Sequence, residues 1–83
     1  MISVEDNKIT GFNSIEFDSK EILELDDGIY KGNTIDEEEV IISRQLGNGF
    51  TIGICLKEKP NWWLYRNYDE NGYLEEEWFE ANQ

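Results

Sequence analysis

The clearest alternation of apolar and polar residues lies in residues 40–57, VIISRQLGNGFTIGICLK. Strand side chains alternate between two faces, so the turn decides which residues share a face. A three-residue turn at 47–49 separates polarity best. One face is then Val40, Ile42, Leu46, Phe50, Ile52, Ile54 and Leu56, and the other is Ile41, Ser43, Gln45, Thr51, Gly53, Cys55 and Lys57. The pattern predicts a β-hairpin with one buried face.

Two residues interrupt this hairpin pattern. Arg44 falls on the apolar face, opposite Ile52. We interpret it as a stem that reaches the rim of the core, with or without a carboxylate partner there, or as half of a buried ion pair that fixes the fold or lines a site. Gly53 interrupts an apolar strand. Such a glycine marks a bulge, or a place where an aromatic ring lies over the backbone.

The C-terminal stretch WWLYRNYDENGYLEEEWFEANQ allows two structures. A hairpin that turns at 71–72 pairs Arg66 with Glu77 and Tyr65 with Trp78, and both kinds of cross-strand pair are favourable. This register also pairs residues 68 and 75. A helix from residue 73 would instead place residues 74, 78 and 81 on one stripe. We favour the hairpin.

The N-terminal half has weaker signals. A hairpin at 27–28 would pair Glu24 with Lys31, whereas residues 18–21 and 34–37 both resemble helix capping boxes. The chain has one alanine and ten isoleucines, which favours strands. We predict a mainly β, single-domain antiparallel meander over residues 1–83, either a curved sheet or a small barrel. One short helix is compatible with it, and an α+β fold is the alternative.

The net charge is −12, a large value for 83 residues. Residues 1–39 carry −9, residues 40–66 carry +3, and residues 67–83 carry −6. Such a chain repels nucleic acid and anionic membrane surfaces and attracts basic proteins. We therefore expect a basic protein partner and no direct nucleic-acid or membrane partner.

The residue types present exclude most catalytic chemistry. The chain has no histidine and one cysteine, so a Ser-His or Cys-His pair cannot form, and a structural zinc site lacks ligands. The acidic runs 36–39 and 69–72 do not match a calcium loop. We expect a protein that is not an enzyme and has no metal or cofactor. The start of the chain has no secretory-signal pattern, so the expected compartment is the cytoplasm.

The candidate site combines acidic runs with tryptophans, a residue type enriched at binding hot spots. Trp62 and Trp63 are consecutive, so on a strand they point to opposite faces. The first acidic patch is Asp36, Glu37, Glu38 and Glu39. The second is Asp69, Glu70, Glu75, Glu76, Glu77 and Glu80, with Trp63 and Trp78 as anchors.

Charge and size suggest a hypothesis for function. The chain would block or shield a basic, nucleic-acid-handling protein, as nucleic-acid mimics, phage inhibitors and immunity proteins do. The alternative is a general protein-interaction or accessory module, monomeric or homodimeric, in which acidity serves solubility alone. A module that binds a cation or a sugar is a third class.

Overall fold

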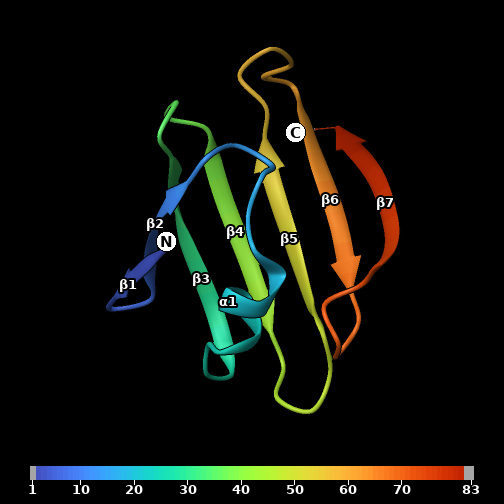
Figure 1. Ribbon diagram of the computed structural model, residues 1–83. Coiled ribbons are helices and arrows are strands. Elements are labelled where there is room, and N and C mark those ends of the chain that lie inside the picture. Colours follow the sequence, from blue (N-terminus) through green and yellow to red (C-terminus); the bar gives the residue numbers. More distant parts are fainter. Residues whose placement is uncertain (1, 82–83) are drawn as a thin grey trace.

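The computed structural model describes residues 2–81 as a single curved sheet of seven strands, in the order β1-β2-β3-β4-β5-β6-β7 (Figure 1). The strands are β1 (Ser3–Glu5), β2 (Lys8–Phe12), β3 (Gly28–Thr34), β4 (Glu39–Arg44), β5 (Phe50–Cys55), β6 (Trp62–Tyr68) and β7 (Leu74–Ala81). The outermost strands, β1 and β7, do not pair, so the sheet does not close into a barrel. The predicted mainly β, mostly antiparallel class is confirmed.

One pair of neighbours, β2 and β3, is parallel, which a simple meander does not contain. Parallel strands need a crossover connection, and residues 13–27 provide it. The crossover includes the only helix in residues 2–81, α1 (Ser19–Leu23). The side chain of Asp18 caps it by accepting a hydrogen bond from the backbone N–H of Lys20 at 3.0 Å. One of the two predicted capping boxes therefore starts a helix.

The other local predictions for this half were wrong. Glu24 is the C-cap of α1, and Lys31 pairs with Ile41 on β4, so no hairpin joins Glu24 to Lys31. At the second capping box no helix forms. The Thr34 hydroxyl instead accepts hydrogen bonds from the backbone N–H groups of Asp36 and Glu38, which closes the β3–β4 turn.

The hydrophobic core lies between the crossover and one face of the sheet, which we call the covered face (Figure 1). Its fully buried side chains are Phe12, Ile9, Ile22, Ile42, Ile52 and Ile54. Phe17, in the crossover, makes edge-to-face contacts with Phe12, Phe50 and Tyr68. Each large apolar side chain buried here contributes about 1.5–3 kcal/mol. This face therefore supplies most of the apolar stabilisation.

The β4–β5 hairpin has the predicted faces but a different register. Arg44 pairs with Phe50, which leaves a five-residue loop at 45–49 in place of three residues. A shift of two residues keeps every strand residue on its predicted face, because the side-chain period is two. Leu46, which we expected on the apolar face, lies in the loop and is 62% exposed.

The buried Arg44 side chain explains the wider loop. Its guanidinium donates to the backbone carbonyls of Gln45, Asn48 and Gly49, and to that of Leu23 at the end of α1. No carboxylate lies within 4.0 Å of it among residues 2–81. The ion pair expected for Arg44 is therefore wrong for residues 2–81, since carbonyl groups take the place of an acidic partner. The side chain ties the hairpin loop to the crossover.

The C-terminal hairpin is confirmed and the helix alternative is wrong. Arg66 pairs with Glu77 and Tyr65 with Trp78, as predicted. The register shifts near the turn, where Tyr68 pairs with Leu74 and Glu75 becomes a bulge residue.

Within the described residues, no helix combines the length and apolar character needed to cross a bilayer.

Candidate docking face

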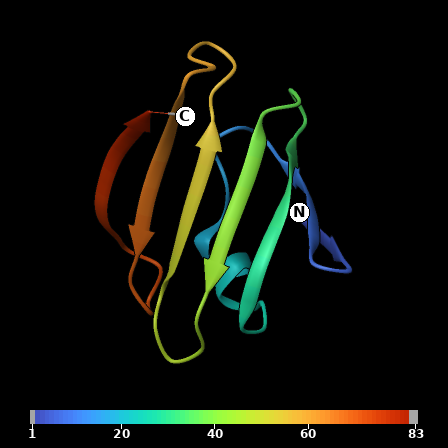
Figure 2. The ribbon, with the colours of Figure 1, turned by 180° about the vertical axis from the view of Figure 1, so that it is seen from behind.

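The sheet face opposite α1, which we call the open face, is crossed by no helix or loop of residues 2–81 (Figure 2). Cross-strand partners share a face, so the register defines rows of side chains on it. The central row is Glu5, Lys8, Lys31, Ile41, Gly53, Tyr65 and Trp78. The row beside it is Asn33, Glu39, Cys55, Trp63 and Glu80, and the row on its other side is Ile29, Ser43, Thr51, Asn67 and Glu76.

Three aromatic rings form a ladder across β6 and β7. Trp63 stacks on Tyr65 with ring centroids 6.2 Å apart, and Tyr65 stacks on Trp78 at 5.5 Å. Tyr65 also lies over Gly53, where an added Cβ would be 2.6 Å from the tyrosine Cε1 atom. Neither β5 pairing has a register shift, so Gly53 is the site of ring-over-backbone packing and not of a bulge. All three rings are half-buried and partly reach solvent.

Carboxylates surround this ladder. We define the acidic aromatic face as Glu39, Trp63, Tyr65, Glu76, Trp78 and Glu80. The three glutamates are exposed, and none has a cationic group within 4.0 Å in residues 2–81. Burial and the neighbouring Glu80 carboxylate raise the pKa of Tyr65. Burial, with the charges of Glu39 and Glu38, raises the pKa of Cys55 in the same way. The thiol and the phenol therefore stay neutral in a negative field.

The first acidic patch is divided between surface and interior. Asp36 and Glu37 are exposed on the β3–β4 turn, and Glu39 joins the open face. Glu38 is 7% exposed and accepts hydrogen bonds from the Lys57 backbone N–H at 2.9 Å and from the Thr34 hydroxyl at 3.3 Å. Burial raises the pKa of Glu38, but these hydrogen bonds, together with one from the Ser14 side chain and the charge of Lys57, outweigh it and hold the pKa below its ordinary value.

The second acidic patch is divided in a different way. Strand alternation places Glu77 on the covered side of β7, where it forms an ion pair with Arg66. Asp69 and Glu70 lie in the β6–β7 turn, at the opposite end of the sheet from the β3–β4 turn (Figure 1). The Asp69 carboxylate accepts from the backbone N–H groups of residues 71 and 73. The two predicted patches therefore do not merge, and Glu39, Glu76 and Glu80 are the members that share the open face.

The opposite half of the open face carries both signs of charge, because Glu5 pairs with Lys8 across β1 and β2 and Asp6 lies in the turn between them. Lys8 and Lys31 are exposed on β2 and β3, beside a groove with a volume of about 790 Å³ that also contacts Ile29, Ile41 and Trp63. Sequence reasoning missed this half and also missed Tyr65. The lysines become neighbours only through the parallel β2–β3 pairing, which has no local sequence signal.

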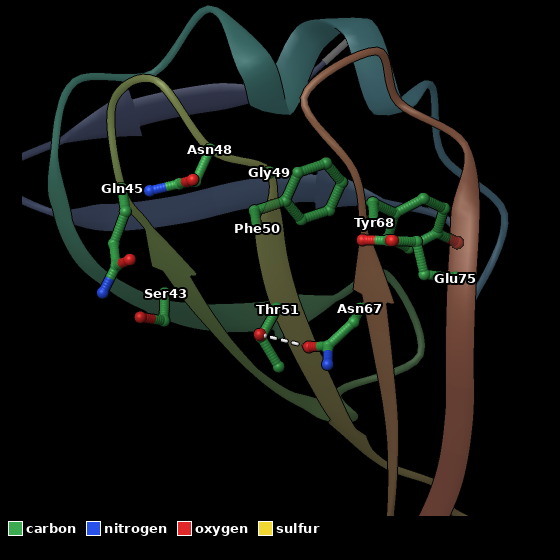
Figure 3. Close-up of a pocket in the computed structure, with 9 residues that line it drawn as sticks. All are labelled: Ser43, Gln45, Asn48, Gly49, Phe50, Thr51, Asn67, Tyr68 and Glu75. Atoms are coloured by element: carbon green, nitrogen blue, oxygen red, sulfur yellow. Dashed lines mark hydrogen bonds between the residues drawn. The ribbon is translucent and has the colours of Figure 1, made fainter.

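A second, smaller hollow of about 240 Å³ lies beside the β4–β5 loop (Figure 3). The Thr51 hydroxyl donates to the side-chain oxygen of Asn67 at its edge, and Phe50 stacks on Tyr68 behind it. Glu75 is the only charged side chain that lines it. The hollow presents no nucleophile with an adjacent base. Across residues 2–81, no three acidic, cysteine or histidine side chains are arranged to hold a metal.

No family model, curated protein or solved structure matches this chain.

Proposed function

We propose that this chain is a non-enzymatic acidic binding protein that blocks or shields a basic protein, with the acidic aromatic face as its contact surface. The observation that carries the proposal is the set of unpaired carboxylates of Glu39, Glu76 and Glu80 around two half-buried tryptophans. The fold does not use these carboxylates, since they make no ion pair within residues 2–81.

The two kinds of side chain have separate tasks in this proposal. The carboxylates, together with a net charge of −12, attract a basic surface over a distance and orient it. The rings of Trp63 and Trp78 lose their remaining contact with water when the partner docks, and such large rings supply most of the affinity at interfaces. The ladder is already stacked, so little side-chain freedom is lost on binding.

The proposed partner is a nucleic-acid-handling protein, such as a nuclease, in the cytoplasm. Its binding groove is basic because it neutralises phosphates. An acidic face can occupy such a groove and exclude the nucleic acid, which is the action of an inhibitor or an immunity protein. The chain itself carries 19 acidic and 7 basic residues, so it does not compete for nucleic acid.

Binding and activity assays with a panel of purified basic nucleases test the proposal. The test variant is the double substitution Glu76→Gln and Glu80→Gln on the open face. The matched control is Glu16→Gln with Glu24→Gln, which removes the same charge from two exposed positions in the crossover. Each chain is assayed from about 50 to about 500 mM salt, a range that screens exposed charges.

We expect at least one nuclease to be bound and inhibited at low salt, with affinity falling about tenfold or more across the series. The open-face double variant should lose most of this binding, whereas the control variant should keep it. Binding that ignores salt, or equal losses in both variants, would refute docking through this face. Absence of binding to every nuclease at low salt would also count against the proposal.

One observation favours a second candidate function, a homodimeric interaction module. The open face is basic at Lys8 and Lys31 and acidic at Glu76 and Glu80, so two copies related by a two-fold axis can place opposite charges together. Sedimentation equilibrium at low salt tests it. A dimer that Lys31→Glu dissociates supports this module, and a monomer at all concentrations excludes it.

A further inference from the structure

Strand β7 forms one edge of the sheet, and no other strand within residues 2–81 pairs with its outer side. Within residues 2–81 it pairs with β6 alone, and all its residues except Trp78 are exposed. It runs for eight residues, whereas β1 at the other edge has three. Every second residue of an edge strand directs its backbone N–H and C=O away from the sheet. β7 therefore offers a row of main-chain hydrogen-bonding groups that another extended chain can use.

The two sides of β7 differ in whether their side chains already have partners. On the covered side, Glu77 is paired with Arg66, and the Lys59 ammonium lies 5.5 Å from the centre of the Phe79 ring. On the open side, Glu76 and Glu80 have no cation within 4.0 Å among the described residues. Only the open side of β7 therefore retains unused anionic groups.

The ring of Trp78 adds a second recognition element on the open side. One of its faces stacks on Tyr65, with an angle of 15° between the planes. Because β7 is the last strand, no further strand of the sheet covers the other ring face. A cationic side chain on an adjacent strand can stack there, as Lys59 already does on Phe79.

We propose that β7 binds an extended segment of the basic partner that carries Arg or Lys at every second position and adds an eighth strand to the sheet. This inference rests on the proposed function and specifies the part of the partner that is recognised. Main-chain hydrogen bonds hold the segment, and its alternate cations face Glu76, Trp78 and Glu80. The residues between them face the covered side and need no charge.

A second copy of this chain does not fit the same edge. Pairing two β7 strands would bring glutamates 75, 76, 77 and 80 of one copy against those of the other, and like charges on adjacent strands are destabilising. The acidic residues thus protect the edge from self-association and select a basic strand. Charge complementarity identifies the occupant as a cationic segment.

The test uses the full chain and three capped heptapeptides, Thr-Arg-Thr-Arg-Thr-Arg-Thr and two versions methylated on the backbone nitrogens of either the arginines or the threonines. The three probes have the same charge. Only one set of amides faces β7 in an added strand, so we expect one methylated peptide to bind about tenfold or more weakly and the other to bind like the parent. Hydrogen exchange should show new protection at every second amide of residues 76–81.

The outcomes separate the two proposals. Equal binding of all three peptides, without alternating protection, would overturn strand addition and leave charge-based docking standing. Failure of the parent peptide to bind, while basic nucleases bind through Glu76 and Glu80, would also overturn strand addition alone. Failure of both the peptides and the nucleases would overturn both proposals.

Discussion

The two faces of the sheet treat charged side chains in opposite ways. On the covered face, the guanidinium of Arg44 binds four backbone carbonyls, although its Nε has no partner among the described residues. Glu38, next to that face, is similarly held by internal hydrogen bonds. On the open face, the carboxylates of Glu39, Glu76 and Glu80 bind no cation of the described chain.

This contrast separates charge that supports the fold from charge that is free for a partner. Burying an ionised group without partners is costly. The hydrogen bonds of the Arg44 guanidinium therefore offset the cost of removing it from water. An exposed carboxylate carries no such requirement. Substitutions on the covered side should therefore change stability, whereas charge removal on the open face should change binding.

Truncation of one isoleucine on each face should give the largest difference in stability. Ile42 is fully buried on the covered face and Ile29 is 56% exposed on the open face. We expect Ile42→Ala to lower the free energy of unfolding by about 4 kcal/mol and Ile29→Ala by about 0.5 kcal/mol or less. Urea unfolding measures both. Similar losses would show that the open face is also a packed interior.

Substitution of Arg44 by Met keeps most of the buried stem and removes every donor. The carbonyls of Leu23, Gln45, Asn48 and Gly49 would lose a hydrogen bond each, so we expect a loss of about 3 kcal/mol in urea unfolding. Lys31→Met, which removes an exposed cation from the open face, is the control and should cost about 0.5 kcal/mol or less. A stabilised Arg44→Met variant would contradict this role.

A methyl group at position 53 tests the packing of the aromatic ladder. In Gly53→Ala the new Cβ would lie 2.6 Å from Tyr65, so the ring must move and the ladder with it. We expect a loss of about 2 kcal/mol, together with a changed near-ultraviolet circular dichroism spectrum. In a Tyr65→Ala background, where the clashing ring is absent, Gly53→Ala should cost less stability than it does in the parent chain. An equal cost in both backgrounds would place the strain elsewhere.

The pH dependence of stability should report on Glu38. Of the four stability changes predicted here, we expect this one to be the smallest. The pKa of Glu38 in the folded state lies below its ordinary value of 4.5, so the folded chain binds this proton less readily than the unfolded chain. Its stabilising effect is complete above the unfolded-state pKa and is lost as the pH falls through the folded-state pKa. We expect Glu38→Gln to cost about 1 kcal/mol at neutral pH.

Urea unfolding at neutral pH and near pH 3 checks this expectation. The difference between Glu38→Gln and the parent chain should shrink at the lower pH, because the unfolded chain takes up the Glu38 proton there and the folded chain does so less readily. Glu37→Gln, an exposed neighbour on the same turn, is the control and should differ little from the parent at either pH. A difference that grows toward acid would show that the folded-state pKa is raised instead.

Local signals explain which parts of the fold could be predicted. The β6–β7 hairpin follows from a favoured turn and complementary pairs such as Arg66 with Glu77, all within one short stretch. The cap at Asp18 is equally local. The parallel β2–β3 pair joins segments separated by the crossover, and no residue near either strand indicates it.

The candidate site was only partly predictable for the same reason. Alternation along β7 places Glu76, Trp78 and Glu80 together, and that much can be read from the sequence. The addition of Glu39 to this group requires the register of four strands, from β4 to β7. Burial of Glu38 depends on hydrogen bonds from Lys57 and Thr34, which charge counting does not reveal.

The three indole N–H signals of the chain offer the most direct test of docking through the open face. Trp63 and Trp78 lie on that face, whereas Trp62 points to the other side of β6 and is 45% exposed, which makes it an internal control. Cross-saturation NMR from a bound basic nuclease would measure which indoles contact the partner. We predict strong saturation of Trp63 and Trp78 and little of Trp62. Saturation of Trp62 alone, or of none of the three, would contradict docking through the acidic aromatic face.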